Sequence, residues 1–471
     1  MSLNPEFRRN LWLQVSWQRL FAAPTFALLM VGAFMASPFS DKLYPAAHWA
    51  CFVILGLWGT RRAADSLSEE ASGGTWEGQR MSGLGAWQMA WGKLIGGTAF
   101  VWYCAAFALL ILVGARLQLG PEADHGKPVS LVVYNLVLGG LLSHCVSFAV
   151  AIILLRKAVS YRRLTITLAQ TCGFVTFLTF AFGGVPGGDN PYRDVQGLLD
   201  QHTMLFGNEV QVEIYRAVAI TLFGAWTVLA IYRLMRLELQ YRNWPWAWSA
   251  FVAFMLLFAA SMNQNPALGP AGWLLWLTMM GSVLTYLSLF SDVRDPVRYR
   301  WALRAIWAGD FGQALSYTPW WLISYLATIG GAIAAISQIP GVDIAGLSEL
   351  EFFRFFGHLM PELLQASLAL QISLILMLLF MLRDILVVLW LSAGPKRQRA
   401  DVSGLIFLAL VYAPLAVILW GLGGSAFMPV VMPIATSDTL FDLVPILVEI
   451  GIIGAMLYFR WQAATRLGKK Y

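Results

Sequence analysis

Residues 59–94 read GTRRAADSLSEEASGGTWEGQRMSGLGAWQMAWGKL. This charged segment, interrupted by glycines, lies between two strongly apolar runs. A chain that only has to turn around between two apolar helices does not require so long a polar loop. We therefore expect the segment to be a docking element for another protein. A solvated loop with salt bridges at a membrane face is the alternative.

The composition places the chain in a membrane. Of its 471 residues, 58% are hydrophobic and 12% are charged, whereas soluble domains are about 25% charged. Many apolar runs reach about 18 residues or more, the length of a transmembrane helix. Runs such as FALLMVGAFMA (26–36) and ALQISLILMLLFML (369–382) lack the alternation of a membrane β-barrel. The sequence thus predicts an all-α, polytopic membrane protein.

Hydropathy predicts twelve transmembrane helices, and the basic residues predict their orientation. Arg and Lys are concentrated after the second, fourth, sixth, eighth and tenth spans and at both termini, and such positions are cytoplasmic by the positive-inside rule. We therefore expect a multi-pass protein of the cell (inner or plasma) membrane with both termini in the cytoplasm. The predicted spans are residues 22–38, 46–60, 93–115, 131–155, 164–184, 214–235, 245–262, 271–290, 319–338, 361–390, 402–422 and 439–460.

The charge pattern also predicts two similar halves, residues 1–240 and 241–471. In each half a long charged stretch follows the second span, at 61–92 in the first half and at 292–318 in the second. Because each half has an even number of spans, the halves form a parallel repeat related by an axis along the membrane normal. Their sequences are only faintly alike, so this prediction rests on topology and charge.

The N-terminal segment is expected to be an interfacial helix. Its first 22 residues mix Arg8, Arg9 and Arg19 with Trp12 and Trp17, and they lack the pattern of a cleavable signal peptide. Aromatic groups at headgroup level with arginines toward water or phosphate are typical of an amphipathic helix in the membrane interface. An ordinary tail ahead of the first span is the alternative.

The segment 59–94 resembles the cytosolic segment of the type-2 permeases of ATP-binding-cassette (ABC) transporters. That family commonly has a carboxylate pair, Gly-Thr, a further Glu, a small-residue turn and a helix ending in Gly-Lys. The family usually has proline where this chain has Gly83, which makes the turn less rigid. The close match covers about 30 residues, and residues 1–240 agree in layout. The matching residues are Glu69, Glu70, Gly74, Thr75, Glu77, the turn Ser82-Gly83-Leu84, Gly92 and Lys93.

The resemblance implies a permease driven by a separate ATPase subunit. The chain has no P-loop, since Gly92-Lys93 is followed by Leu94, so ATP and Mg would bind in the partner and this chain would bind no cofactor. Two ATPase copies are expected, with room for accessory subunits. The family implies export of a lipid, polysaccharide, drug or peptide. Trp87 would join the first docking surface, and Arg304 and Trp307 would represent a divergent second one.

Ionisable residues inside the spans are the other candidates, because each costs about 2.5–3.5 kcal/mol at a helix centre. They are Glu449 and Asp442 in the last span, Arg383 and Asp384 in the tenth, and His144 in the fourth. We expect the neighbours Arg383 and Asp384 to point in different directions and to need partners on other helices. Ordinary hydrogen bonding between helices is the alternative to a transport role.

Other functional classes are weakly supported. The five histidines are scattered, and the four cysteines have no metal-binding spacing, so we expect no metal and no catalytic centre. The net charge of +6 suits anionic lipid, with no case for nucleic acid. A secondary transporter of two six-span halves, an enzyme acting on lipid-linked substrates, and a second half that only scaffolds remain the rivals. The sequence does not indicate the substrate.

Overall fold

The computed structural model describes residues 4–36, 42–119, 128–157, 162–181, 202–205, 208–241, 243–261, 269–339, 367–394, 400–423, 428–435 and 440–467. The chain divides into two compact units. Unit 1 comprises residues 1–203 and 210–243, and unit 2 comprises residues 204–209 and 244–471. Each unit is described by itself. The interpretation of the halves as a parallel repeat stays a prediction.

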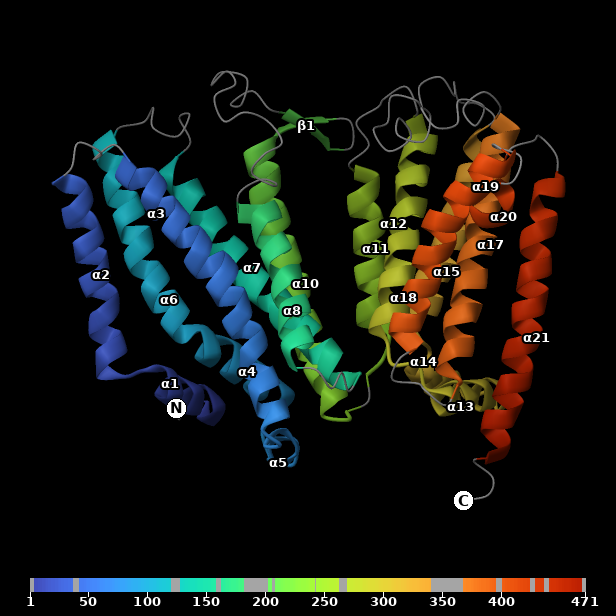
Figure 1. Ribbon diagram of the computed structural model, residues 1–471, viewed down its shortest axis with the longest axis horizontal. Coiled ribbons are helices and arrows are strands. Elements are labelled where there is room, and N and C mark those ends of the chain that lie inside the picture. Colours follow the sequence, from blue (N-terminus) through green and yellow to red (C-terminus); the bar gives the residue numbers. More distant parts are fainter. Residues whose placement is uncertain are drawn as a thin grey trace. The chain divides into compact units, whose positions relative to one another are not determined.

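Unit 1 is a helical bundle whose spans run side by side, with α1 and α5 at the same end of it (Figure 1). A short hairpin of β1 and β2 precedes its last helix. Its helices are α1 (Pro5–Gln14), α2 (Trp17–Met35), α3 (Leu43–Cys51), the π-helical η2 (Phe52–Gly59), α4 (Thr60–Ser72), α5 (Trp76–Arg80), α6 (Ala86–Leu119), α7 (Val129–Arg156), α8 (Arg162–Ala181) and α10 (Val212–Glu238). The strands of the hairpin are β1 (His202–Leu205) and β2 (Asn208–Gln211), of which residues 204–209 are assigned to unit 2.

Unit 2 is also a bundle, with the two short helices α13 and α14 across one end of it (Figure 1). Its elements are α11 (Trp246–Ser261), α12 (Gly269–Ser291), α13 (Pro296–Trp307), α14 (Phe311–Tyr317), α15 (Trp320–Gln338), α17 (Ser367–Ser392), α18 (Ala400–Leu410), the π-helical η9 (Val411–Leu415), α19 (Ala416–Gly423), α20 (Met428–Val431), the 3-10 turn η11 (Leu440–Leu443) and α21 (Val444–Leu467).

The predicted all-α, polytopic class is confirmed. In the described part of the chain, ten helices are long and apolar enough to cross a membrane by length and composition. The other two predicted spans, 46–60 and 245–262, fall on α3 with η2 and on the shorter α11. The count of twelve therefore stays a prediction. Residues 361–366, expected at the start of the tenth span, lie outside the described residues.

Each unit has its own core. In unit 1, Leu55 of η2, Leu112 of α6 and Phe177 of α8 are buried together. In unit 2, Leu289 of α12 and Ile385 of α17 belong to a comparable cluster. Lipid does not drive helices together as water does, so close packing and interhelical hydrogen bonds must hold such bundles. Both kinds of contact position the candidate sites.

Candidate functional site

The polar segment of unit 1 forms a projection from the helical bundle. α4 continues from the span without a break and has 13 residues, so it extends about 20 Å past η2 at 1.5 Å per residue. Gly73 caps it by donating its N–H to the carbonyl of Glu69 at 2.9 Å. Gly74 then has a φ of 71°, a conformation that glycine adopts without strain. The chain turns there and enters α5.

A buried ion cluster holds this projection in place. The Lys93 side chain is 0% exposed; its Nζ donates to Glu6 Oε1 at 2.7 Å and also contacts Glu70 and Gln79. Arg9 contributes a second cation, 2.9 Å from Glu70 Oε1. These five residues come from α1, α4, α5 and α6. One ammonium group therefore joins the N-terminal helix, both arms of the projection and the following span.

Two glycines on α6 allow the N-terminal helix to approach so closely. A Cβ atom at Gly92 would lie 2.7 Å from Glu6 Cβ, and one at Gly96 would lie 2.6 Å from Asn10 Cβ. Any larger residue would push α1 away, because real Cβ atoms do not approach to such distances. The four-residue spacing places both glycines on one face of α6. This face therefore sets the position of Glu6 beside Lys93.

The surroundings of Glu6 favour its charged form. Burial by itself would raise the pKa of this carboxyl group. The hydrogen bond and positive charge of Lys93, the charge of Arg9 and the hydrogen bond from Asn10 act in the other direction, and the pKa is lowered below its ordinary value of 4.5. Asn10 Nδ2 donates to Glu6 Oε1 at 3.0 Å. Glu6 therefore acts as an anionic ligand of Lys93 at neutral pH.

The short helix α5 is tied to the last helix of unit 1. Trp76 is 4% exposed, and its Nε1 donates to Glu238 Oε1 at 3.0 Å. The Lys93 ammonium lies 5.4 Å from the centre of the Trp76 ring, within the range of a cation–π contact. Arg80 pairs with Glu77 at 3.1 Å and lies 3.9 Å from Glu238. The tip of the projection is thus connected to α10 as well as to α6.

The predicted docking residues of unit 1 separate into two groups. Glu70, Gly92 and Lys93 are buried, so they could support a partner-binding surface without touching the partner. The exposed group, to which the structure adds Met81 at 85% exposure, forms the tip. A methionine in a polar turn gave no signal by which the sequence could have identified it. The exposed tip residues are Glu69, Gly74, Thr75, Glu77, Met81, Gly83 and Trp87.

The corresponding segment of unit 2 forms a flat hairpin. Asp295 accepts a hydrogen bond from the Val297 N–H at 3.0 Å and caps α13, and Gly309, with a φ of 73°, reverses the chain before α14. Arg304 and Trp307 are both exposed on α13. The carboxylate and Gly-Thr pattern of the first segment has no counterpart here.

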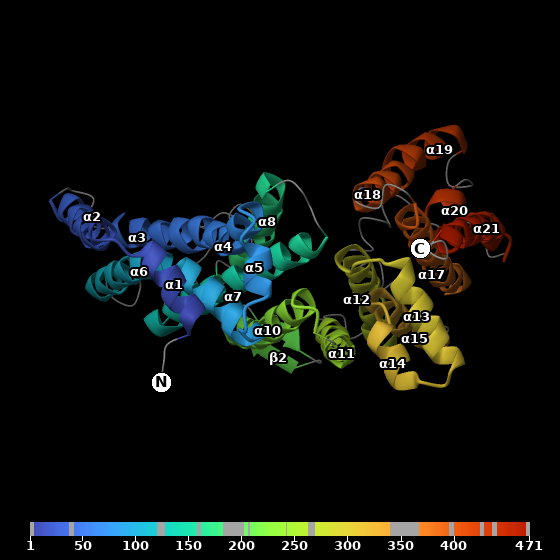
Figure 2. The same ribbon diagram turned by 90° about the horizontal axis from the view of Figure 1, so that it is seen from below.

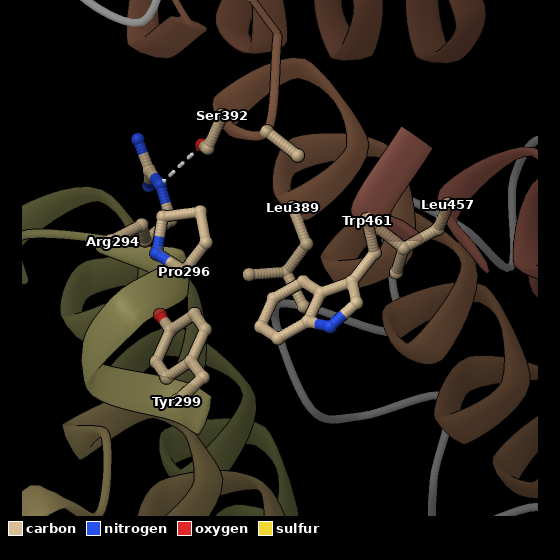
Figure 3. A pocket seen from close by; sticks show the side chains of 8 residues that line it. Arg294, Pro296, Tyr299, Leu389, Ser392, Leu457 and Trp461 are labelled. Carbon is tan, nitrogen blue, oxygen red and sulfur yellow. Dashed lines mark hydrogen bonds between the residues drawn. The ribbon is translucent and has the colours of Figure 1, made fainter. Parts of the chain in front are cut away.

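A pocket lies where α13 meets α17 and α21 (Figure 3). Arg294 points toward Ser392 and donates from Nε to its Oγ at 2.8 Å, and it also pairs with Asp401 of α18. Tyr299 stacks on Trp461 with ring centres 6.4 Å apart. The arginine is thus already bound to protein groups. We interpret the pocket as the seam that fixes α13 to the ends of these spans.

The spans of unit 2 contain a second ion network. Arg383 donates from Nε and Nη2 to Asp384 Oδ1 at 2.9 and 2.8 Å, and from Nη1 to Glu449 Oε2 at 3.0 Å. Tyr286 and Tyr412 donate to Asp384 Oδ2 at 2.6 and 2.8 Å. The expectation that Arg383 and Asp384 point apart is wrong, because the long arginine side chain folds back onto its neighbour. The need for partners on other helices is met by α12, η9 and α21.

Glu449 is the most accessible carboxylate of this network, with 33% of its side chain exposed against 0% for Asp384. Asp442 lies in η11 at the start of the same helix and is half-buried. The ion pairs of Arg383 with Asp384 and with Glu449 join α17 to α21. The structure therefore groups Arg383, Asp384 and Glu449.

His144 fastens α7 to the π-helical turn η2. It is fully buried, and its Nε2 lies 2.9 Å from the Leu55 carbonyl oxygen. Gln170 donates to a further carbonyl of this turn, that of Leu57, at 3.1 Å, and Ser147 donates to the carbonyl of Thr60, the first residue of α4, at 2.7 Å. A π-helical turn interrupts the regular helical bonding and leaves carbonyls for side chains. His144 therefore makes a hydrogen bond between helices.

Within the described residues, no group of three or more His, Cys, Asp or Glu side chains could hold a metal ion. Comparisons of the chain with family models, with curated proteins and with solved structures give no significant match. The functional interpretation therefore depends on the projection of unit 1 and on the ion network of unit 2.

Proposed function

We propose that the chain is the permease subunit of an ABC transporter of the cell membrane, that it exports its substrate, and that a separate ATPase subunit docks on the tip of unit 1. The observation that carries the proposal is the mounting of that tip: a helix projects from a span, turns at Gly74 and is clamped by the buried Lys93. The resemblance of residues 59–94 to type-2 permeases supports the same function.

The buried cluster of Lys93, Glu6, Glu70, Gln79 and Arg9, called the clamp below, is suited to transmit force. A partner that pushes on the exposed tip would load α4 and α5 together, because Lys93 contacts Glu70 on one and Gln79 on the other. The load would pass to α6 through Lys93 itself and to α10 through the Trp76–Glu238 hydrogen bond. A merely solvated loop would not require its charged residues to be buried and paired with three other elements.

Tip variants test the docking. The full chain is co-expressed with a candidate P-loop ATPase subunit and purified through a tag on this chain. We expect Glu69→Lys combined with Glu77→Lys to reduce ATPase recovery at least tenfold, since two exposed carboxylates become cations. The control is Glu209→Lys in β2, an exposed carboxylate on the side predicted to lie outside the cell. Equal recovery with both variants would contradict the proposal.

A secondary transporter is the second candidate, and the ion network of unit 2 favours it. Arg383, Asp384 and Glu449 pair between spans, as expected of a transporter driven by an ion gradient. In proteoliposomes that contain only this chain, substrate uptake driven by an ion gradient and abolished in Glu449→Gln would support this function. Uptake that requires both the ATPase subunit and ATP would support the first proposal.

A further inference from the structure

The segments that join the α13–α14 hairpin to its neighbouring spans keep it at the end of the bundle. α12 ends at Ser291 and α13 begins at Pro296, while α14 ends at Tyr317 and α15 begins at Trp320. Both α12 and α15 are long and apolar enough to cross a membrane. A hairpin held at both ends by such short connections must lie at the depth where the spans leave the hydrocarbon. Figure 2 shows α13 and α14 extended across the end of unit 2.

The outer face of this hairpin is apolar and aromatic. Trp307 is 88% exposed and Phe311 is 67% exposed, and Trp301, Leu303 and Ile306 are each about half exposed. Large aromatic groups of this kind prefer the boundary between headgroups and acyl chains. In water, five such side chains on two short helices would form an unfavourable patch. Their exposure therefore indicates a surface that another phase covers.

The charge on the same face is positive. Arg300 is half-buried and Arg304 is exposed, and neither takes part in an ion pair among the described residues. Arg304 lies 5.8 Å from the centre of the Trp301 ring. The acidic residues of the hairpin are otherwise engaged. Asp292 is buried and pairs with Arg298, while Asp295 and Asp310 cap the starts of α13 and α14. Two available guanidinium groups among aromatic side chains are complementary to phosphate headgroups.

We propose that the exposed face of α13 and the start of α14 bind anionic phospholipid in the leaflet predicted to be cytosolic. Arg300 and Arg304 bind the headgroup phosphates, and Trp307, Phe311 and Ile306 insert at the acyl boundary. The second charged segment is then a membrane-binding element and no ATPase docks there. This proposal stands apart from the proposed function, because it would hold for a secondary transporter as well.

Hydrogen exchange on the full-length chain in nanodiscs tests the proposal. We compare residues 297–311 in discs of phosphatidylcholine alone and in discs with added phosphatidylglycerol. Exchange should slow about 25-fold in the anionic discs, because each of the two arginines contributes roughly fivefold of binding near an anionic surface. The double variant Arg300→Gln with Arg304→Gln should lose this difference. Unchanged exchange in α12 and α15 would show that the variant is folded.

The control variant also removes two arginine charges, but from unit 1. Arg61 and Arg163 are exposed at the predicted cytosolic end of unit 1, and Arg61→Gln with Arg163→Gln should keep the slowing at 297–311. The proposal is overturned if anionic lipid leaves the exchange of this segment unchanged, or if the Arg300 and Arg304 variant retains the full difference. It is also overturned if the ATPase subunit alone protects 297–311 in phosphatidylcholine discs.

Discussion

The two charged segments, 61–92 in unit 1 and 292–318 in unit 2, follow comparable spans and adopt opposite arrangements. The first projects on a continuous helix and presents carboxylates and a Gly-Thr turn at its tip. The second lies flat, capped at both helix starts, and presents tryptophans and arginines. The difference teaches that the position of a charged loop after a span does not by itself determine the structure that the loop adopts. Whether the helix of the preceding span continues without a break, as α4 does after η2, decides how far the charged segment extends from that span.

Removal of the buried cation Lys93 should give the largest difference in behaviour between the two segments. Lys93→Met leaves Glu6 and Glu70 buried with Arg9 as the remaining cation of the cluster, and breaking a buried ion pair in this way costs about 3–5 kcal/mol. Hydrogen exchange of residues 66–92 should accelerate accordingly. Arg304→Met in unit 2 should leave the exchange of its own hairpin unchanged in detergent, because its side chain is exposed. Comparable effects in the two units would refute the contrast.

Close packing at Gly92 gives the next largest expected effect. Gly92→Ala places a methyl group against Glu6 and the backbone of Phe7, and such overpacking costs about 1–3 kcal/mol. Thermal unfolding in detergent should occur at a lower temperature. Gly114→Ala is the matched control on the same helix, since a Cβ there meets nothing within 4 Å. A control that is as destabilised as Gly92→Ala would show that the clash is not the cause.

The seam that holds α13 should respond more weakly than the clamp of unit 1. Arg294→Gln removes the cation beside Asp401, whose side chain is 31% exposed and can be hydrated. We expect a loss at the lower end of the range of about 1.5–3 kcal/mol that is typical of a hydrogen bond to a charged group. Exchange in residues 296–307 measures it. Arg300→Gln is the control, and a loss in that variant equal to the loss in Arg294→Gln would contradict the role of the seam.

Acid should weaken the clamp of unit 1 by the smallest amount. The pKa of Glu6 is lowered in the folded state from its ordinary value of 4.5, so the unfolded chain takes up the proton first as pH falls. The stabilisation is present above about pH 4.5 and is lost as pH drops through the folded pKa, by at most about 1.4 kcal/mol per pH unit. Melting curves between pH 6 and 3 should show less pH dependence in Glu6→Gln. An unchanged profile would exclude Glu6 as the titrating group.

The order of residue types along the chain predicted part of the candidate site. Contacts between residues far apart in the sequence could not be predicted in this way. The glycines and carboxylates of 69–77 were identifiable from their order along the chain. Glu6 and Glu238 were not, although both contact the projection, because their partners lie far away in the sequence. Glu6 is the one acidic residue of α1, which also contains Arg8 and Arg9. The available signal for a buried polar contact was that Glu6 and Asn10 lie four residues apart, on the same face of α1.

Apolar length determined the membrane-spanning class of this protein from its sequence alone, because a helix must hide its backbone polar groups from lipid over a fixed thickness. The order of polar residues likewise indicated where a tip could form. Only the tertiary structure decided that Lys93 and Glu70 face inward, that Arg383 folds onto Asp384, and that α13 lies flat. These outcomes depend on which helices approach closely enough for side chains to pair, and glycines such as Gly92 and Gly96 set that distance.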